Sequence, residues 1–153
     1  RKNLDKNNLK NIKILSYATK YASNFYGPFR DAVGSKKLLS GDKKTYQMDY
    51  RNSSEALREV FLDIKEGADI VMVKPGMPYL DIIKLIKDNF KIPIFSYQVS
   101  GEYSLLKNGI KKNIIGKEAI SESIMSLKRA GSSAVITYFA LDLAKELKNN
   151  FLK

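Results

Sequence analysis

The sequence predicts an α/β fold built on a parallel sheet, and two observations carry this prediction. Short apolar runs recur along the chain, and each is followed by a stretch in which apolar residues have helical spacing. Strands that are apolar on both faces and alternate with helices are typical of parallel sheets. The four runs expected to form strands are residues 12–17, 69–73, 92–97 and 134–139.

The first helix expected between these runs covers residues 52–66. Asn52 and Glu55 have the spacing of a capping box, in which the two side chains satisfy backbone groups at the start of a helix. The apolar stripe that we expect to pack on the sheet consists of Leu57, Phe61 and Ile64.

Residues 79–89 and 117–130 repeat the same design, and Gly131 ends the second of these helices. A last helix is expected at about 141–148, and residues 1–8 are expected to be the tail of a preceding helix. The apolar stripe of the helix at 79–89 is Leu80, Ile83 and either Ile86 or Leu85. That of the helix at 117–130 is Ile120, Ile124 and Leu127.

Four strand and helix units make half of a (β/α)₈ TIM barrel, which typically needs about 250 residues. Half a barrel would leave two open sheet edges, which proteins normally cover or pair. The chain begins with Arg1 rather than methionine. We therefore expect residues 1–153 to be a single partial domain, the C-terminal half of a barrel whose N-terminal half is absent.

Composition restricts the possible function classes. No apolar run approaches the roughly 20 residues that cross a bilayer, so no membrane partner is expected. The chain has no cysteine and no histidine, which removes disulfides and the usual nitrogen and sulfur ligands of zinc. The net charge is +11, but 22 of the 27 basic residues are scattered lysines. Specific nucleic-acid readers favour clustered arginine and exposed aromatics, so no nucleic-acid partner is expected.

Two lysines stand at predicted strand ends. Lys74 follows the apolar run 70–73, and Lys20 lies just past the first predicted strand. The C-terminal ends of barrel strands converge on the active site, which favours a catalytic role. A strand-end lysine that simply extends its ammonium group into water is the alternative for Lys74 taken alone.

Two amines in one cavity have a chemical consequence. Ammonium groups held close in a partly apolar pocket repel each other and are poorly solvated, and both effects lower a lysine pKa toward neutrality. A neutral amine can attack a carbonyl and form a Schiff base. Ser100 and Tyr138, at the predicted ends of the third and fourth strands, and Arg30 can bind carboxylates. The sequence therefore indicates an enzyme that handles carbonyl compounds bearing carboxylates.

Four segments carry a resemblance to a known family. They are SYATKYASNFYGPFRDA (16–32), GADIVMVKPGMPYLDI (67–82), YQVSGEY (97–103) and the pair KRAG and ITYFALDLA within 128–144. These blocks are similar to the matching blocks of porphobilinogen synthases, also called 5-aminolevulinate dehydratases. The resemblance implies a (β/α)₈ barrel and a lyase that condenses two 5-aminolevulinate molecules into porphobilinogen, with loss of two waters, in tetrapyrrole biosynthesis.

The resemblance also implies roles for individual residues. Lys74 matches the lysine that forms the Schiff base with one substrate, and Lys20 matches the lysine that binds the second substrate. Residues matching the substrate-binding positions are Ser100 and Tyr138 for the first carboxylate, Arg30 and Gln47 for the second, and Tyr26, Phe29 and Tyr97 for the cavity wall. Residues 27–47 match a mobile lid. Within it, Lys43 stands where an arginine is expected, and lysine lacks the planar guanidinium that binds a carboxylate through two hydrogen bonds.

By the same resemblance, zinc or magnesium is expected. Catalytic zinc ligands, where the family has them, lie upstream of this chain. Glu59 fits a magnesium position at a subunit contact. The alternative is that Glu59 is an ordinary exposed glutamate on a helix. The expected partners are 5-aminolevulinate and further copies in a cytoplasmic homo-octamer, with a plastid as the other possible location. The alternative function is an inactive truncated copy or assembly partner of the enzyme, and a stop codon in the upstream reading frame would favour it.

Overall fold

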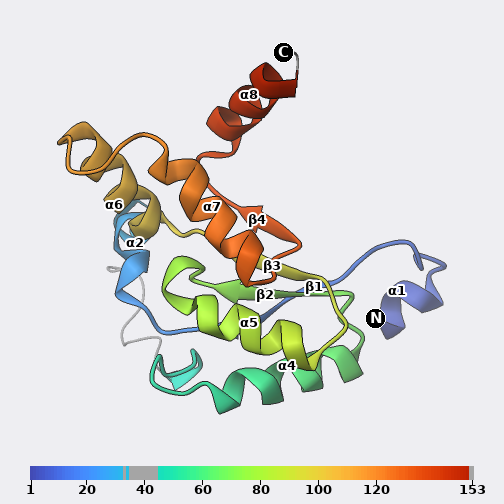
Figure 1. Ribbon diagram of the computed structural model, residues 1–153. Coiled ribbons are helices and arrows are strands. Elements are labelled where there is room, and N and C mark those ends of the chain that lie inside the picture. Colours follow the sequence, from blue (N-terminus) through green and yellow to red (C-terminus); the bar gives the residue numbers. More distant parts are fainter. Residues whose placement is uncertain (33, 35–44, 152–153) are drawn as a thin grey trace.

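The computed structural model describes residues 1–32, 34 and 45–151 (Figure 1). Its sheet has four strands in the order β1-β2-β3-β4, and every neighbouring pair is parallel. The strands are β1 (Leu15–Lys20), β2 (Ile70–Lys74), β3 (Ile94–Tyr97) and β4 (Ala134–Ile136). Sequential order and parallel pairing are the topology of half a (β/α)₈ barrel, as predicted.

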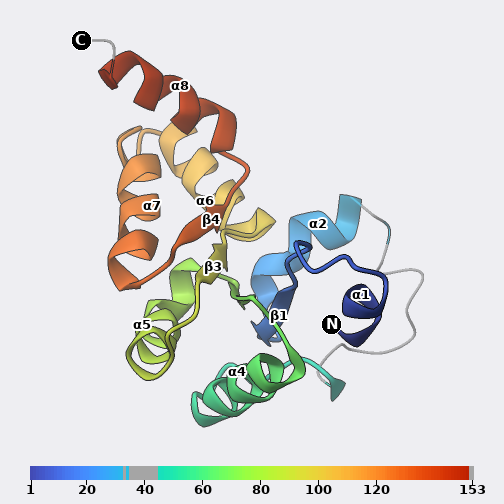
Figure 2. The ribbon, with the colours of Figure 1, turned by 90° about the vertical axis from the view of Figure 1, so that its right-hand side faces the viewer.

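Helices α4 (Ser54–Glu66), α5 (Leu80–Asn89) and α7 (Ala119–Ala130) follow one another along one face of the sheet (Figures 1 and 2). Two helices, α2 (Gly27–Ala32) and α6 (Ser100–Lys111), pack against each other beyond the carboxyl ends of the strands. The remaining elements are α1 (Lys2–Lys6), the 3₁₀ turns η1 (Asn24–Tyr26) and η3 (Met77–Tyr79), and α8 (Ala140–Phe151), which projects away from the sheet.

The main core lies between the sheet and the helices on its covered face. Strand residues Val71, Val73 and Ile94 are fully buried there, against the similarly buried Val60 of α4 and Ile83 of α5. Because side chains alternate along a strand, the residue that follows Val73 points to the opposite face. Core packing on one face thus directs the side chain of the last β2 residue toward the other face.

Helix predictions are largely confirmed. Asn52 Oδ1 accepts the Glu55 backbone N–H at 3.2 Å, which is one of the two bonds of the predicted capping box. The second differs, because the Glu55 carboxylate accepts from the side-chain amide of Asn52 at 3.3 Å, while the Asn52 backbone N–H donates to Asp49. Gly131 ends α7 with a positive φ of 130°. The stripe predicted for α4 is wrong at Phe61, whose ring is 46% exposed beneath Lys65, because Ala56 and Val60 fill the contact with the sheet instead.

Two further differences concern the start of β1 and a helix that was not predicted. β1 begins at Leu15 rather than at residue 12, because its partner β2 begins at Ile70, directly opposite Leu15. Helix α6 was not predicted, although Tyr103, Leu106 and Ile110 have helical spacing and pack in a second apolar cluster with Phe139. In the part of the chain that the structure describes, no helix is long and apolar enough to cross a membrane.

Candidate functional site

Lys20 and Lys74 lie opposite each other at the carboxyl ends of two neighbouring strands. Each is the last residue of its strand, and the β1–β2 register pairs them directly. The sequence placed Lys20 just past its strand, and the structure places it within β1, three residues further along than the predicted end. The two side chains therefore share one face of the sheet, which brings both amines to one place.

Three tyrosine rings surround the amine of Lys74. Its Nζ lies 3.9 Å from the ring centroid of Tyr97, 5.2 Å from that of Tyr17 and 5.8 Å from that of Tyr26. Burial, and then the positive charge of Lys20, lowers the pKa of Lys74 to about 8. The ring faces favour the ammonium form and offset part of this shift. At a pKa of about 8, roughly a tenth of the Lys74 amines are neutral at pH 7.

The aromatic stretch after β1 packs over this pair. Tyr26 is buried, and its hydroxyl donates to the backbone oxygen of Lys74 at 3.1 Å. Burial raises the pKa of Tyr26 well above its ordinary value, so its hydroxyl keeps its proton. The guanidinium carbon of Arg30 lies 5.3 Å from the Tyr26 ring centroid, while the Phe29 ring is 53% exposed. Tyr26 thus lies beside Lys74, Arg30 lies against the Tyr26 ring, and the Phe29 ring is largely uncovered.

Ser100 and Tyr138 come from the junctions that follow β3 and β4. Ser100 opens α6 instead of ending β3, and its hydroxyl accepts the Phe29 N–H at 3.1 Å. Tyr138 follows β4, and its ring centroid lies 5.3 Å from that of Tyr103. Burial, and then the neighbouring Tyr138, raises the pKa of Tyr97. Tyr97 therefore connects the surroundings of Lys74 with Tyr138.

The remaining predicted site residues are Gln47, Lys43 and Glu59, and of these the structure places Gln47 near the strand ends. Gln47 is buried, and among the described residues its Oε1 is the buried side-chain oxygen that has no hydrogen-bond partner. The next residue, Met48, donates its N–H to the backbone oxygen of Lys20 at 3.1 Å, so Gln47 lies near the end of β1. Lys43 lies outside the described residues. Glu59 is half-buried on α4.

Sequence reasoning missed Tyr17 as a neighbour of Lys74. With β1 placed at residues 12–17, Tyr17 fell at the end of the strand, away from Lys20. The observed strand carries both residues, and a break in the β1–β2 register between Ser16 and Thr19 lies beside Tyr17. The available signal was that Tyr17 and Tyr97 are the last residues of two predicted strands, 12–17 and 92–97.

Contact between α6 and η1 depends on Gly101. A Cβ at this position would lie 2.4 Å from the backbone oxygen of Phe25, which cannot move without displacing the aromatic stretch. In the full-length protein we expect Gly101→Ala to lower the free energy of unfolding by about 1–3 kcal/mol, measured as a lower thermal midpoint. The matched control is Gly27→Ala, because a Cβ there meets nothing within 4 Å. Equal midpoints for the two variants would contradict this packing.

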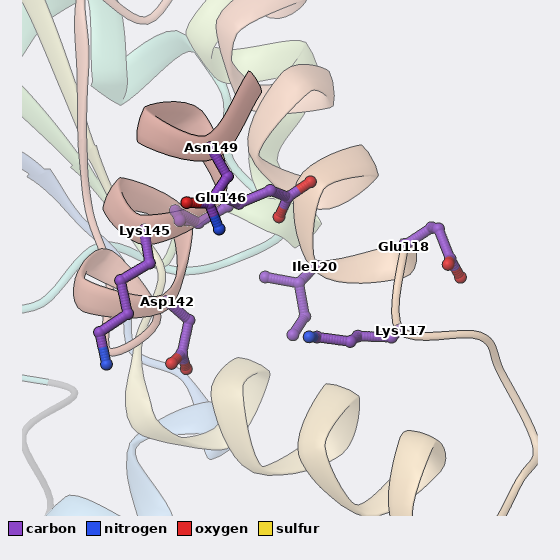
Figure 3. Close-up of a pocket in the computed structure, with 8 residues that line it drawn as sticks. Lys117, Glu118, Ile120, Asp142, Lys145, Glu146 and Asn149 are labelled. Carbon is purple, nitrogen blue, oxygen red and sulfur yellow. The ribbon is translucent and has the colours of Figure 1, made fainter. Parts of the chain in front are cut away.

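A separate hollow of about 360 Å³ lies between the start of α7 and α8 (Figure 3). It contains neither lysine of the strand-end pair. Its lining mixes charges of both signs with two apolar side chains, and consists of Lys117, Glu118, Ile120, Asp142, Leu143, Lys145, Glu146 and Asn149. The candidate catalytic amines therefore lie at the strand ends and not in this hollow.

Known proteins share both the sequence and the fold of this chain. The family model described as "Delta-aminolevulinic acid dehydratase" matches residues 1–146. The delta-aminolevulinic acid dehydratase of Bradyrhizobium diazoefficiens is 55% identical over 149 residues, which are 97% of this chain and 42% of that protein. The Rhodobacter capsulatus protein of the same name is 58% identical over 137 residues, covering 89% of this chain and 41% of that protein.

A solved structure agrees with these sequence matches. The crystal structure of delta-aminolevulinic acid dehydratase (porphobilinogen synthase) from Toxoplasma gondii ME49, in complex with the reaction product porphobilinogen, has a TM-score of 0.90 at 50% identity. The match covers 95% of this chain and 42% of that one. The chain thus spans less than half the length of these relatives. With the family model matching nearly the whole chain, it belongs to the delta-aminolevulinic acid dehydratase family.

Proposed function

We propose that this chain forms the C-terminal half of the catalytic barrel of a porphobilinogen synthase. The reaction condenses two molecules of 5-aminolevulinate into porphobilinogen and releases two waters. The observation that carries the proposal is the pairing of Lys20 with Lys74 at neighbouring strand ends. Family membership supports the same activity, since the solved relative was crystallised with porphobilinogen as its reaction product.

In the proposed mechanism, Lys74 acts as the nucleophile toward the ketone of the first substrate. Its neutral amine forms a carbon–nitrogen bond, the ketone oxygen leaves as water, and a Schiff base results. The lowered pKa of Lys74 makes a neutral amine available near physiological pH. Lys20 binds the second substrate beside it. A carbon next to the ketone of the second substrate loses a proton and bonds to the former ketone carbon of the first, and Lys74 leaves that carbon as a free amine. The amine of the first substrate replaces the ketone oxygen of the second, which leaves as the second water.

The substrate carboxylates are assigned to polar residues around the lysines. Ser100 and Tyr138 are proposed to bind the carboxylate of the first substrate, and Arg30, Gln47 and Lys43 that of the second. The buried, unpartnered Oε1 of Gln47 accepts hydrogen bonds only, so its amide nitrogen would be the donor to a carboxylate. Tyr26, Phe29 and Tyr97 are proposed as the walls of the cavity.

No step of the proposed mechanism passes through a metal ion. Within residues 1–32, 34 and 45–151, no three metal-ligating side chains converge. Glu59 is proposed as one magnesium ligand at a subunit contact in a homo-octamer, with the other ligands supplied from outside this segment. The proposed location is the cytoplasm, or a plastid in a photosynthetic cell.

The direct test is an assay of the full-length gene product with 5-aminolevulinate, measuring porphobilinogen. We expect one porphobilinogen for every two substrate molecules consumed. A folded full-length protein that forms no product with either zinc or magnesium present would support the alternative of an inactive copy or assembly partner. The assay therefore separates the two functions.

A further inference from the structure

Glu102 is a buried carboxylate for which the proposed mechanism has no use. It lies in the first turn of α6 and is 1% exposed. One carboxylate oxygen, Oε2, accepts the backbone N–H of Val99 at 2.5 Å, and the other, Oε1, accepts the backbone N–H of Met77 at 2.5 Å. The first contact is an ordinary helix-start interaction, whereas the second reaches a different segment.

That second segment is the turn that directly follows Lys74. Met77 is three residues beyond Lys74, and Pro75 and Gly76 between them are buried. At Gly76 the turn passes so close to β3 that a Cβ would lie 3.3 Å from the backbone oxygen of Tyr97. The Gln98 amide nitrogen lies 3.3 Å from the sulfur of Met77. The turn after Lys74 is therefore fastened to the junction between β3 and α6, and Glu102 accepts one hydrogen bond from each of these two segments.

Burying a carboxylate at this position costs free energy of desolvation that an apolar or amide side chain would not cost. Burial raises the pKa of Glu102 to about 7, and the backbone hydrogen bonds from Val99 and Met77 oppose the shift. The ionisable groups with electrostatic contact to it are Tyr26 and Tyr79, which are neutral at that pH. An amide has one acceptor oxygen and would turn an N–H₂ group toward one of the two donors. Only a carboxylate accepts from both sides.

We propose that Glu102 is a positioning residue for Lys74: its carboxylate fastens the turn at Met77 to the start of α6 and thereby fixes the amine of Lys74 among its three tyrosine rings. The inference rests on the proposed function, because it assigns Glu102 an effect on Schiff-base formation. Glu102 itself does not touch the substrate. Its effect passes through the backbone of residues 75–77, which continue from β2 directly.

The test compares Glu102→Gln with Glu55→Gln in the full-length enzyme. Glu55 is the matched control, since it also lies in the first turn of a helix but contacts the Asn52 amide and not the turn that follows Lys74. We expect Glu102→Gln to lower kcat at least tenfold while KM changes less than threefold, and Glu55→Gln to change neither. In Glu102→Gln, borohydride trapping with 5-aminolevulinate should reach its half-maximal rate at a higher pH. The reason is that a less buried Lys74 has a higher pKa and is neutral only at higher pH.

Glu102→Asp serves as the second variant, since it keeps the charge but shortens the side chain. If Glu102→Gln does not fold, the same shift in the pH dependence of trapping is expected in Glu102→Asp. The inference is overturned if a folded variant shows the trapping rate and the pH dependence of the unchanged enzyme. It is also overturned if neither variant folds, because Glu102 would then have a purely structural role. If Lys74→Ala is inactive at the same time, the proposed function stands without this inference; if Lys74→Ala is fully active, the proposed function itself fails.

Discussion

Replacing Lys74 by alanine in the full-length enzyme is expected to lower kcat by at least about a thousandfold, which corresponds to roughly 4 kcal/mol of activation free energy. The physical reason is that no other amine occupies the end of β2, so the Schiff base has no nucleophile at that position. Porphobilinogen formation at saturating 5-aminolevulinate measures the effect. Alanine also leaves the rings of Tyr17, Tyr26 and Tyr97 around an empty volume, so the folded state must be checked by thermal unfolding.

The matched control for Lys74→Ala is Lys91→Ala, because Lys91 is exposed just before β3 and carries no role in the mechanism. Its activity should equal that of the unchanged enzyme. If Lys74→Ala retains more than about a tenth of the activity, a difference of only about 1.4 kcal/mol, Lys74 is not the nucleophile.

Lys20→Ala is expected to separate the two lysines by function. Porphobilinogen formation should fall at least about a hundredfold, since the second substrate loses the amine that binds it. Schiff-base formation at Lys74 should persist, because burial is the larger cause of its lowered pKa and remains in the variant. The pKa of Lys74 should rise from about 8, since the repulsion from Lys20 is gone, so trapping at pH 7 should slow and recover at higher pH.

Measurements of trapping and turnover on the same Lys20→Ala preparation test this separation. An unchanged pH dependence of trapping would show that the two amines do not interact in solution. Full porphobilinogen formation would show that Lys20 does not bind the second substrate. Lys91→Ala is again the control, with both quantities unchanged.

The alternation of strands and helices was predictable because it depends on local apolar patterns. Val71, Val73 and Ile94 are apolar because the sheet face that they occupy is covered by helices, and this composition appears directly in the sequence. The polar residue that ends such a run, Lys74, could be located for the same reason. Its position at a strand end required no knowledge of tertiary contacts.

The register between strands was not predictable from either strand alone. The run at 12–17 has strand composition, yet Ile12 is 51% exposed and β1 starts at Leu15, where β2 offers a partner. Pairing with a neighbour therefore decides the ends of the strand, and the direct opposition of Lys20 and Lys74 follows from that pairing. Composition cannot supply this information, because each run is compatible with several registers against its neighbour.

Helix α6 and Glu102 were missed for a related reason. Gly101 and Gly109 weaken helix propensity, so the segment favoured a loop on local grounds. Gly101 is required there by the close approach of Phe25, a contact between residues 76 positions apart. Glutamate is almost never fully buried unless it is paired, and nothing in the neighbouring sequence marks Glu102 as buried. The buried position depends on the turn at Met77, which is also distant in the chain.

The most direct test of the proposed chemistry is to identify which lysine carries the substrate. The full-length enzyme is incubated with 5-aminolevulinate and borohydride, digested, and the modified peptide is sequenced by mass spectrometry. We expect the reduced adduct on Lys74 when one molecule of substrate is added per active site. Lys20 should be modified only later or to a smaller extent. An adduct on Lys20 alone would reverse the assigned roles, and an enzyme that makes porphobilinogen with no adduct on either lysine would contradict the Schiff-base mechanism.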